Sequence, residues 1–409
     1  MPQPEQVWAW PPGPGTGGPQ AVQAWAWPPP VQPRRTGGSL ARPRPGTAYH
    51  RMARTWRYRW WVPLVAIGVA VGLIIVVQLV MGMAAVILAL VNGYEATGDS
   101  FFGALLPDLA FQLIVITTMT PLVMLVAWLV QRRPVGTLFS VTGRLRWRWM
   151  LGCAAIAIIP MVLSFAFLAG LLRATTPGTP FLGAFGGGPD FVGALLIILL
   201  LVPFQASAEE IALRGFLMQS VGSLGAPADD PRGGSVVSRF LRSPVLGILI
   251  SGTVFTFLHA YVGWGLLDVA VFGIAMAWLT WYTGGLEAAI GLHVVHNLAA
   301  FGLTAYEGGL ADVGTGGGSW QGVVATTVEV ILYCLVVAWL ARKVGLQRTV
   351  PDDPAAAAGQ GYRPAPQAWA AGPRQGTTGA SAYHDPYRAP ATPRFRQEPP
   401  AGGPPAPPA

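Results

Sequence analysis

Two adjacent glutamates and an arginine follow an uninterrupted apolar run. Residues 191–203 are apolar, and the pattern Glu209-Glu210-x-x-x-Arg214 comes soon after them. A charged side chain at the centre of a membrane helix costs about 2.5–3.5 kcal/mol on insertion scales. Charges kept at such a position are therefore expected to be paired, hydrated or functional.

Three of the five histidines lie in apolar segments further along the chain. His259 ends the pattern Phe255-x-x-x-His259, and His293 begins the pattern His293-x-x-x-Asn297, with His296 inside it. Positions i and i+4 share one face of a helix, so we expect Phe255 beside His259 and His293 beside Asn297. Polar groups on three separate apolar segments indicate a common site.

The rise of a helix gives an estimate of depth for these groups. Glu209, His259 and His293 come out at roughly 15, 22 and 11 Å from the cytoplasmic face, which is one layer that helix tilt would bring together. Arg214 follows Glu210 by four residues, the spacing of an ion pair. Glu210 is therefore assigned to Arg214, and Glu209 is left free.

A free carboxylate and an imidazole in a dry pocket together deprotonate a water molecule. A second histidine and an asparagine donate hydrogen bonds to the oxyanion of a tetrahedral intermediate, so this set would hydrolyse an amide bond. The same Glu209, His259 and His293 would also suffice as ligands of a catalytic zinc or another divalent metal. The residues leave open both ways of activating the water.

Eight apolar runs must position these side chains. Each is close to the roughly 20 residues that a helix needs to cross a bilayer. They are residues 63–90, 109–130, 149–172, 191–219, 245–262, 264–282, 286–306 and 323–340. The sequence therefore predicts an all-α, polytopic transmembrane helical bundle.

The charges of the loops alternate along this bundle. Basic residues flank the start of the first run and follow the second, fourth and eighth runs, whereas acidic residues follow the first, third and seventh. Arginine and lysine accumulate on the cytoplasmic side of membrane proteins. The pattern predicts a protein of the plasma membrane with both termini in the cytoplasm.

Composition supports this class of protein. The chain has 409 residues, of which 52% are apolar and 11% charged, against about 25% charged residues in soluble proteins. The net charge of +8 comes from arginines beside apolar runs, so we expect no nucleic-acid partner. Cys153 and Cys334 both lie inside apolar runs and are expected to be small buried side chains without a disulfide framework.

The two ends of the chain differ from the transmembrane domain predicted for residues 59–348. Residues 1–58 and 349–409 are rich in proline, glycine and alanine and are expected to be disordered cytoplasmic tails. The N-terminal end has no signal-peptide pattern. His50 and His384 fall in these tails, where their neighbours indicate no chemistry.

The three motifs, in this order and on separate apolar segments, resemble those of the CAAX-protease and bacteriocin-processing family, which includes type II CAAX prenyl endopeptidases. Gly215 and Phe216 after the arginine, and Thr283-Gly284-Gly285 ahead of His293, also fit, so that the resemblance covers about residues 149–306. It implies an all-helical intramembrane endopeptidase, with a pocket open to lipid and cytoplasm, that acts on a membrane-bound or lipidated peptide.

The resemblance also implies roles for individual residues. Glu209 would activate the water with His259, while His293 and Asn297 would stabilise the oxyanion. The supporting positions would be Glu210, Arg214 and Phe255. His296 departs from the pattern and is expected to be a neighbour rather than a ligand. The composition resembles that of a high-GC bacterium, so a bacteriocin-like peptide, a signalling protein and an envelope protein are all open as substrates.

Two further classes of function compete with a protease. In a proton- or cation-coupled transporter, Glu209, Asp268, Glu329 and the histidines would form a relay. A catalytically silent immunity or scaffold protein would keep only the fold. We expect Asp268 and Glu329 to make interhelical hydrogen bonds, and Glu287 to be favoured by the dipole at its helix start.

Overall fold

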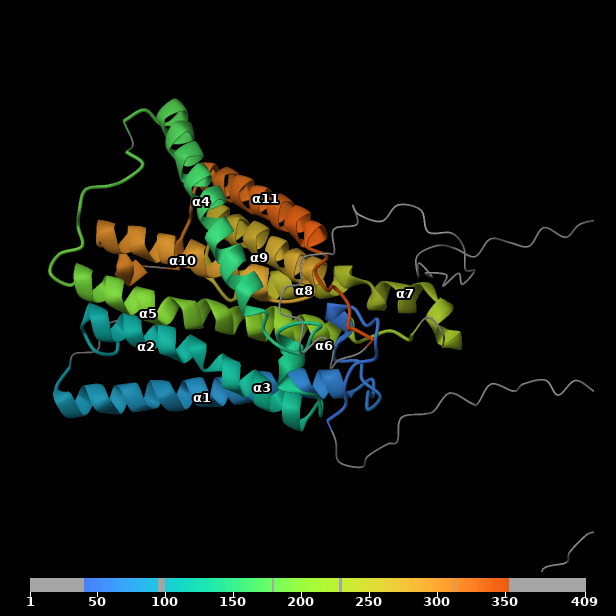
Figure 1. The fold of residues 1–409 in the computed structure, drawn as a ribbon. Helices are drawn as coiled ribbons and strands as arrows, with labels where there is room; N and C mark the ends of the chain where they lie inside the picture. The colour runs from blue at the N-terminus through green and yellow to red at the C-terminus, as the bar shows by residue number, and fades with distance from the viewer. Residues whose placement is uncertain (1–39, 95–99, 179, 228–229, 313, 353–409) are drawn as a thin grey trace, which may run out of the picture. The chain divides into compact units, whose positions relative to one another are not determined.

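The computed structural model describes residues 40–94, 100–178, 180–227, 230–312 and 314–352. Most of these residues are helical (Figure 1). The longer helices are α1 (Val62–Asn92), α2 (Leu105–Thr117), α3 (Met119–Leu129), α4 (Trp147–Thr175), α5 (Phe191–Glu210), α8 (Pro244–Phe257), α9 (Gly263–Thr283), α10 (Glu287–Glu307) and α11 (Trp320–Lys343). Short elements are η1 (Tyr49–Arg51), η2 (Val135–Leu138), the π-helix η3 (Ile211–Leu217), α6 (Met218–Gly222), η4 (Pro231–Gly234), α7 (Val236–Arg242), β1 (Ala260–Tyr261), η5 (Leu310–Asp312) and β2 (Thr315–Gly316).

The predicted membrane bundle is confirmed. Within the described ranges, 7 spans are long and apolar enough to cross a membrane, or up to 8 when the bent pair α7 and α8 counts as one. The helices α2 and α3 together make one span, and α5 continues through η3 into α6 as another. The fifth predicted span is shorter than expected, because α8 ends at Phe257 and the chain turns there into β1.

Helix α10 carries two of the three histidines of interest. It packs against α4, α5 and α9, and α9 packs in turn against α8 and α11. At the far end of α8, β1 pairs in parallel with β2, which joins Ala260 to Thr315 and Tyr261 to Gly316. This pairing fixes the chain immediately after His259.

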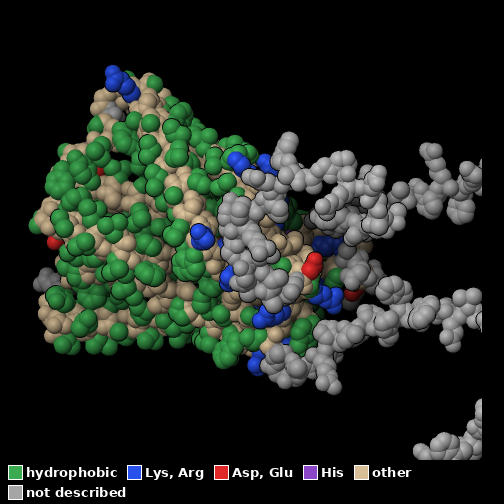
Figure 2. All heavy atoms as spheres, in the orientation of Figure 1, with side chains coloured by type: hydrophobic (Ala, Val, Ile, Leu, Met, Phe, Trp, Pro, Cys, Tyr) green, Lys and Arg blue, Asp and Glu red, His purple; other side chains and the backbone are tan. Residues whose placement is uncertain are grey.

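One end of the bundle, which we call the basic end, collects the arginines of the loops. Figure 2 shows Lys and Arg side chains gathered where Figure 1 has α6 and α7. Contacts between loops join this end together. Arg146 forms a bidentate pair with buried Glu287, at 2.7 and 2.8 Å, and Arg348 donates to the carbonyl of Tyr282 at 2.6 Å. Glu287, which was expected to be favoured by the dipole at the start of α10, is thus also held by an ion pair with Arg146.

Residues 40–58 differ from the disordered tail expected of them. Arg51 donates to the carbonyls of Gly222 and Leu224, and Arg54 to those of Ser223 and Gly225, at 2.6–3.2 Å. These arginines satisfy carbonyls at the end of α6, which have no partner within the helix. Residues 40–58 are ordered because their arginines cap the end of α6. The amino-acid composition of this segment does not predict such a contact. The predicted tails 1–39 and 353–409 lie outside the described residues.

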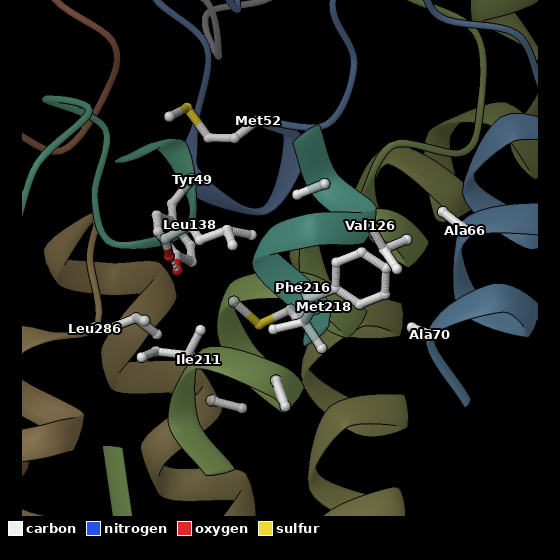
Figure 3. Close-up of a cluster of buried hydrophobic side chains, with 14 of the residues drawn as sticks. Tyr49, Met52, Ala66, Ala70, Val126, Leu138, Ile211, Phe216, Met218 and Leu286 are labelled. Atoms are coloured by element: carbon white, nitrogen blue, oxygen red, sulfur yellow. Dashed lines mark hydrogen bonds between the residues drawn. The ribbon is translucent and has the colours of Figure 1, made fainter. Parts of the chain in front are cut away.

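A buried apolar cluster lies under this segment (Figure 3). Tyr49 is fully buried in it and donates from its hydroxyl to the carbonyl of Leu138 at 2.5 Å. The other labelled members are Met52, Ala66, Ala70, Val126, Leu138, Ile211, Phe216, Met218 and Leu286. The cluster joins the docked segment to η3, the stretch that directly follows the paired glutamates.

The docked segment predicts a pH dependence of stability. His50 is buried and donates from Nε2 to the carbonyl of Arg242 at 2.9 Å, since a carbonyl only accepts. Burial lowers the pKa of His50 to about 4. Because the folded pKa lies below the unfolded value near 6.5, the contribution to stability is complete above about pH 6.5 and is lost as the pH falls toward 4, by about 3 kcal/mol.

Thermal or denaturant unfolding of wild type and His50→Gln between pH 4 and pH 7.5 measures this contribution. Glutamine keeps a donor for the Arg242 carbonyl but does not titrate, so the variant should lose less stability in acid. An identical decline in both proteins would contradict the assignment.

Candidate functional site

The helix that carries the glutamates changes its winding immediately after them. Helix α5 ends at Glu210, and η3 continues from Ile211 to Leu217 as a π-helix, whose backbone bonds span five residues. Such bulges are rare and often occur at functional sites. Six residues before Glu209, Pro203 has no backbone N–H to donate, and Ser207 donates to its carbonyl at 2.6 Å. The glutamates therefore lie between two local irregularities of one span.

Glu210 and Arg214 form the expected ion pair inside the protein. Both are fully buried, and Arg214 Nη1 lies 3.0 Å from Glu210 Oε1. Arg214 Nη2 donates to the carbonyl of Gly273 on α9 at 3.0 Å, and the guanidinium lies 4.3 Å from the ring centroid of Phe255. A Cβ atom at Gly273 would come within 2.8 Å of the Phe255 ring. The close packing of Phe255 against α9 therefore needs glycine at this position.

The same carboxylate orients the first histidine of α10. His293 Nδ1 lies 2.8 Å from Glu210 Oε1, and its ring is 2% exposed. Since a carboxylate accepts, Nδ1 carries a proton, and Nε2 is the nitrogen left for chemistry. That Nε2 faces the other glutamate, at 3.6 Å from Glu209 Oε2.

Glu209 differs from Glu210 in its partners. Its Oε1 accepts from Gln205 Nε2 at 2.6 Å, and Gln205 Oε1 accepts in turn from Asn297 Nδ2 at 3.2 Å. Its Oε2 is buried and has no hydrogen-bond partner among the described residues. The 3.6 Å to His293 Nε2 is too long for a hydrogen bond. Glu209 thus has one oxygen held in place and one oxygen available beside His293.

His259 reaches this group through Phe255. The two rings lie 4.6 Å apart, and the Phe255 ring is 5.7 Å from that of His293. His259 Nδ1 donates to the carbonyl of Phe255 at 2.8 Å, which leaves Nε2 as the free nitrogen of the ring. Among the described residues, no hydrogen bond or ion pair joins His259 to Glu209 directly.

The remaining polar groups lie beyond Phe272. The ring of Phe272 is 5.4 Å from that of His293 and 4.8 Å from that of His296. His296 Nδ1 contacts both oxygens of buried Glu329 on α11, at 3.2 and 3.3 Å. The expected interhelical contact of Glu329 is therefore present, and Asp268 on α9 lies within electrostatic range of this pair.

The described donor groups around Glu209 do not form a set of metal ligands. Within the described ranges, no three His, Cys, Asp or Glu side chains form a group that could hold a metal ion. His293 Nε2 is free and lies 3.6 Å from Glu209 Oε2, but among the described residues His259 does not complete a set of three with them. The arrangement as it stands does not fit the Glu209, His259 and His293 ligands that the sequence left open.

The structure brings together most of the residues selected from the sequence. Glu209, Glu210, Arg214, His293 and Asn297 share one network through hydrogen bonds and ion pairs. The ring of Phe255 contacts Arg214, His259 and His293. Their catalytic roles stay predictions.

Gln205 was missed, although it is 4% exposed and links Glu209 to Asn297. Its signal was available, since it lies one helical turn before Glu209 within an apolar span.

Comparison with known proteins gives a family for part of the chain. Residues 191–299, from the start of α5 into α10, match the family model described as type II CAAX prenyl endopeptidase Rce1-like. The matched segment contains all three motifs, so the resemblance seen in the sequence is confirmed there, and it supports CAAX-protease-like peptidase activity at the level of the family.

One curated protein is also similar to the chain. It is an uncharacterized protein, YyaK, of Bacillus subtilis (strain 168), 25% identical over 200 residues. The alignment covers 47% of this chain and 60% of that relative's length. No solved structure matches the chain.

Proposed function

We propose that this chain, whose residues 191–299 are an Rce1-like segment, is an intramembrane endopeptidase that hydrolyses a peptide bond of a membrane-associated or lipidated peptide. The observation that carries the proposal is the environment of Glu209. One carboxylate oxygen is held by Gln205, and the other is buried, without a partner, and 3.6 Å from His293 Nε2.

The proposed reaction begins with a water molecule beside Glu209 Oε2. Glu209 takes a proton from the water as the water oxygen attacks the carbonyl carbon of the peptide bond. The carbon–nitrogen bond then breaks, and Glu209 returns the proton to the leaving amine. His259, whose Nε2 is free, would share the first proton transfer with Glu209.

Two groups could stabilise the oxyanion that forms between these steps. Asn297 uses one amide hydrogen on Gln205 and has a second to donate. His293 would donate to it from Nε2, while Glu210 accepts from Nδ1 and holds the ring in place. In this account Glu210 and Arg214 hold His293 and do not touch the substrate.

The basic end supports the proposed orientation in the membrane. Arginines gather there, as on cytoplasmic sides generally, so we assign both termini of the described part to the cytoplasm of a bacterial cell. Arg214 lies one turn beyond Glu210 toward that end, and α6 finishes the span. The bond to be cut would thus lie within the membrane, nearer its cytoplasmic side.

The test is cleavage of defined peptides by the purified full-length protein in proteoliposomes. A panel should contain a prenylated peptide, an acylated peptide and a transmembrane peptide, and mass spectrometry should identify both products. We expect cleavage of at least one member by wild type, and none by Glu209→Ala or His259→Ala. Cleavage that survives both substitutions would contradict the site.

The same samples separate the two ways of activating water. Metal content is measured directly, and activity is compared before and after a chelator. We expect activity to persist in metal-free protein, because in the glutamate mechanism Glu209 activates the water without a metal. This fits the described donor groups, which do not form a set of three metal ligands. Activity that is lost with the metal and restored by zinc would favour the metal mechanism instead.

A further inference from the structure

A cavity at the basic end lies on elements that the proposed hydrolase does not use. Its volume is about 520 Å³, within the range of ligand pockets. Its lining residues are Trp56, Arg57, Arg59, Trp61, Val62, Val130 and Arg132. They come from the segment before α1, from the first residue of α1 and from the residues that follow α3. Among the described residues, no acidic side chain lines the cavity, and its three arginines give it a positive charge that favours an anion.

The tryptophans place this cavity at the level of the lipid headgroups. Trp56 and Trp61 are each 48% exposed, and the neighbouring Trp60 is 70% exposed. Tryptophan is enriched where a membrane helix meets the headgroups. Helix α1 begins at Val62 and is apolar from there on. The ligand is therefore expected to be an anion that is itself located at the membrane surface.

Among the described residues, Arg57 has a buried donor atom without a partner, whereas Arg132 is held in place by a backbone contact. The Arg57 guanidinium lies 4.6 Å from the ring centroid of Trp56, and its Nε is buried without a partner among the described residues. Arg132 has φ 53°, a left-handed conformation uncommon for a residue other than glycine. Its carbonyl accepts from the backbone of Ala41 at 2.7 Å, which holds it in that conformation.

We propose that this arginine pocket binds the phosphate of an anionic phospholipid of the cytoplasmic leaflet. Guanidinium groups bind phosphate through paired charge-assisted hydrogen bonds, and Trp56 and Trp61 would lie against the glycerol and upper acyl region. The chain's own tails are poor candidates on charge. Residues 1–39 have Glu5 against Arg34 and Arg35, and residues 353–409 have three acidic side chains against five arginines.

Native mass spectrometry of the full-length protein tests the proposal. The protein, in a neutral detergent, is given equal amounts of phosphatidylglycerol and phosphatidylcholine with the same acyl chains. Wild type should retain phosphatidylglycerol preferentially. The triple variant Arg57→Gln, Arg59→Gln, Arg132→Gln should lose that preference, by about fivefold for each arginine.

A matched triple variant separates a site from diffuse charge. Arg44, Arg148 and Arg342 are exposed and lie outside the pocket. Changing these three to glutamine removes the same charge and should leave the preference intact. The single variant Arg59→Gln, at an exposed position, repeats the measurement if the pocket triple folds poorly.

Three results would overturn the proposal. They are the absence of any preference in wild type, an equal loss in both triple variants, and full displacement of the lipid by millimolar inorganic phosphate. The last result would indicate a site for soluble phosphate. None of these results measures peptide cleavage, so the failure of this proposal would leave the proposed hydrolase activity untouched.

Discussion

Glu209→Gln is expected to lower kcat for peptide cleavage by about 10²–10⁴-fold, the usual contribution of a general base. Glutamine keeps the size of the side chain and can still hydrogen-bond to Gln205, but it cannot take a proton from water. Substrate binding should change little, because the loss falls on the transition state, and KM should therefore stay near the wild-type value. Initial rates over a range of peptide concentrations in proteoliposomes give both constants.

The matched control is Glu307→Gln at the far end of α10. Glu307 is exposed and accepts from the backbone of Gly183 at 2.8 Å, away from the site. This variant should cleave as wild type does. A Glu209→Gln protein that keeps more than a tenth of the wild-type kcat would contradict the role of Glu209 as the base.

Arg214→Leu is expected to reduce the free energy of unfolding by about 3–5 kcal/mol, because it leaves the Glu210 carboxylate buried without its cation. Both members of the pair are fully buried, so solvent does not screen the charge that remains. The change also removes the donor to the Gly273 carbonyl and the cation above Phe255. Unfolding of the purified variant in mixed micelles, titrated with a denaturing detergent, measures the loss.

A double variant tests whether the pair is the cause. Glu210→Leu combined with Arg214→Leu removes both charges and should recover part of the stability that Arg214→Leu loses. It should nevertheless cleave poorly, since His293 Nδ1 would have no carboxylate to orient it. If Arg214→Leu unfolds like wild type, the ion pair does not support the site.

The sequence predicted those parts of the site that depend on local spacing. The ion pair of Glu210 with Arg214 followed from their four-residue separation, which left Glu209 outside that pair. The estimate from helical rise placed His293 in the same layer as Glu209, and His293 Nε2 lies 3.6 Å from Glu209 Oε2. The depths of the histidines in the membrane stay predictions. Apolar runs of bilayer length were sufficient to predict the bundle.

Contacts between distant segments were not predictable in this way. The bond from Glu210 to His293 joins α5 to α10, and no periodicity reports which nitrogen of a ring meets which oxygen. Arg51 and Arg54 looked like a charged membrane flank, yet both bind carbonyls after α6. The early end of α8 depends on the pairing of β1 with β2, two strands of two residues each that leave no pattern in the sequence.

The most direct test of the account is cleavage in water enriched in ¹⁸O by wild type and by Glu209→Gln. The wild-type product should carry one ¹⁸O in its new carboxylate, because the attacking oxygen comes from water. Glu209→Gln should form almost none of this product in the same time. Undiminished formation of the labelled product by Glu209→Gln, or a wild-type product without the label, would contradict water activation by Glu209.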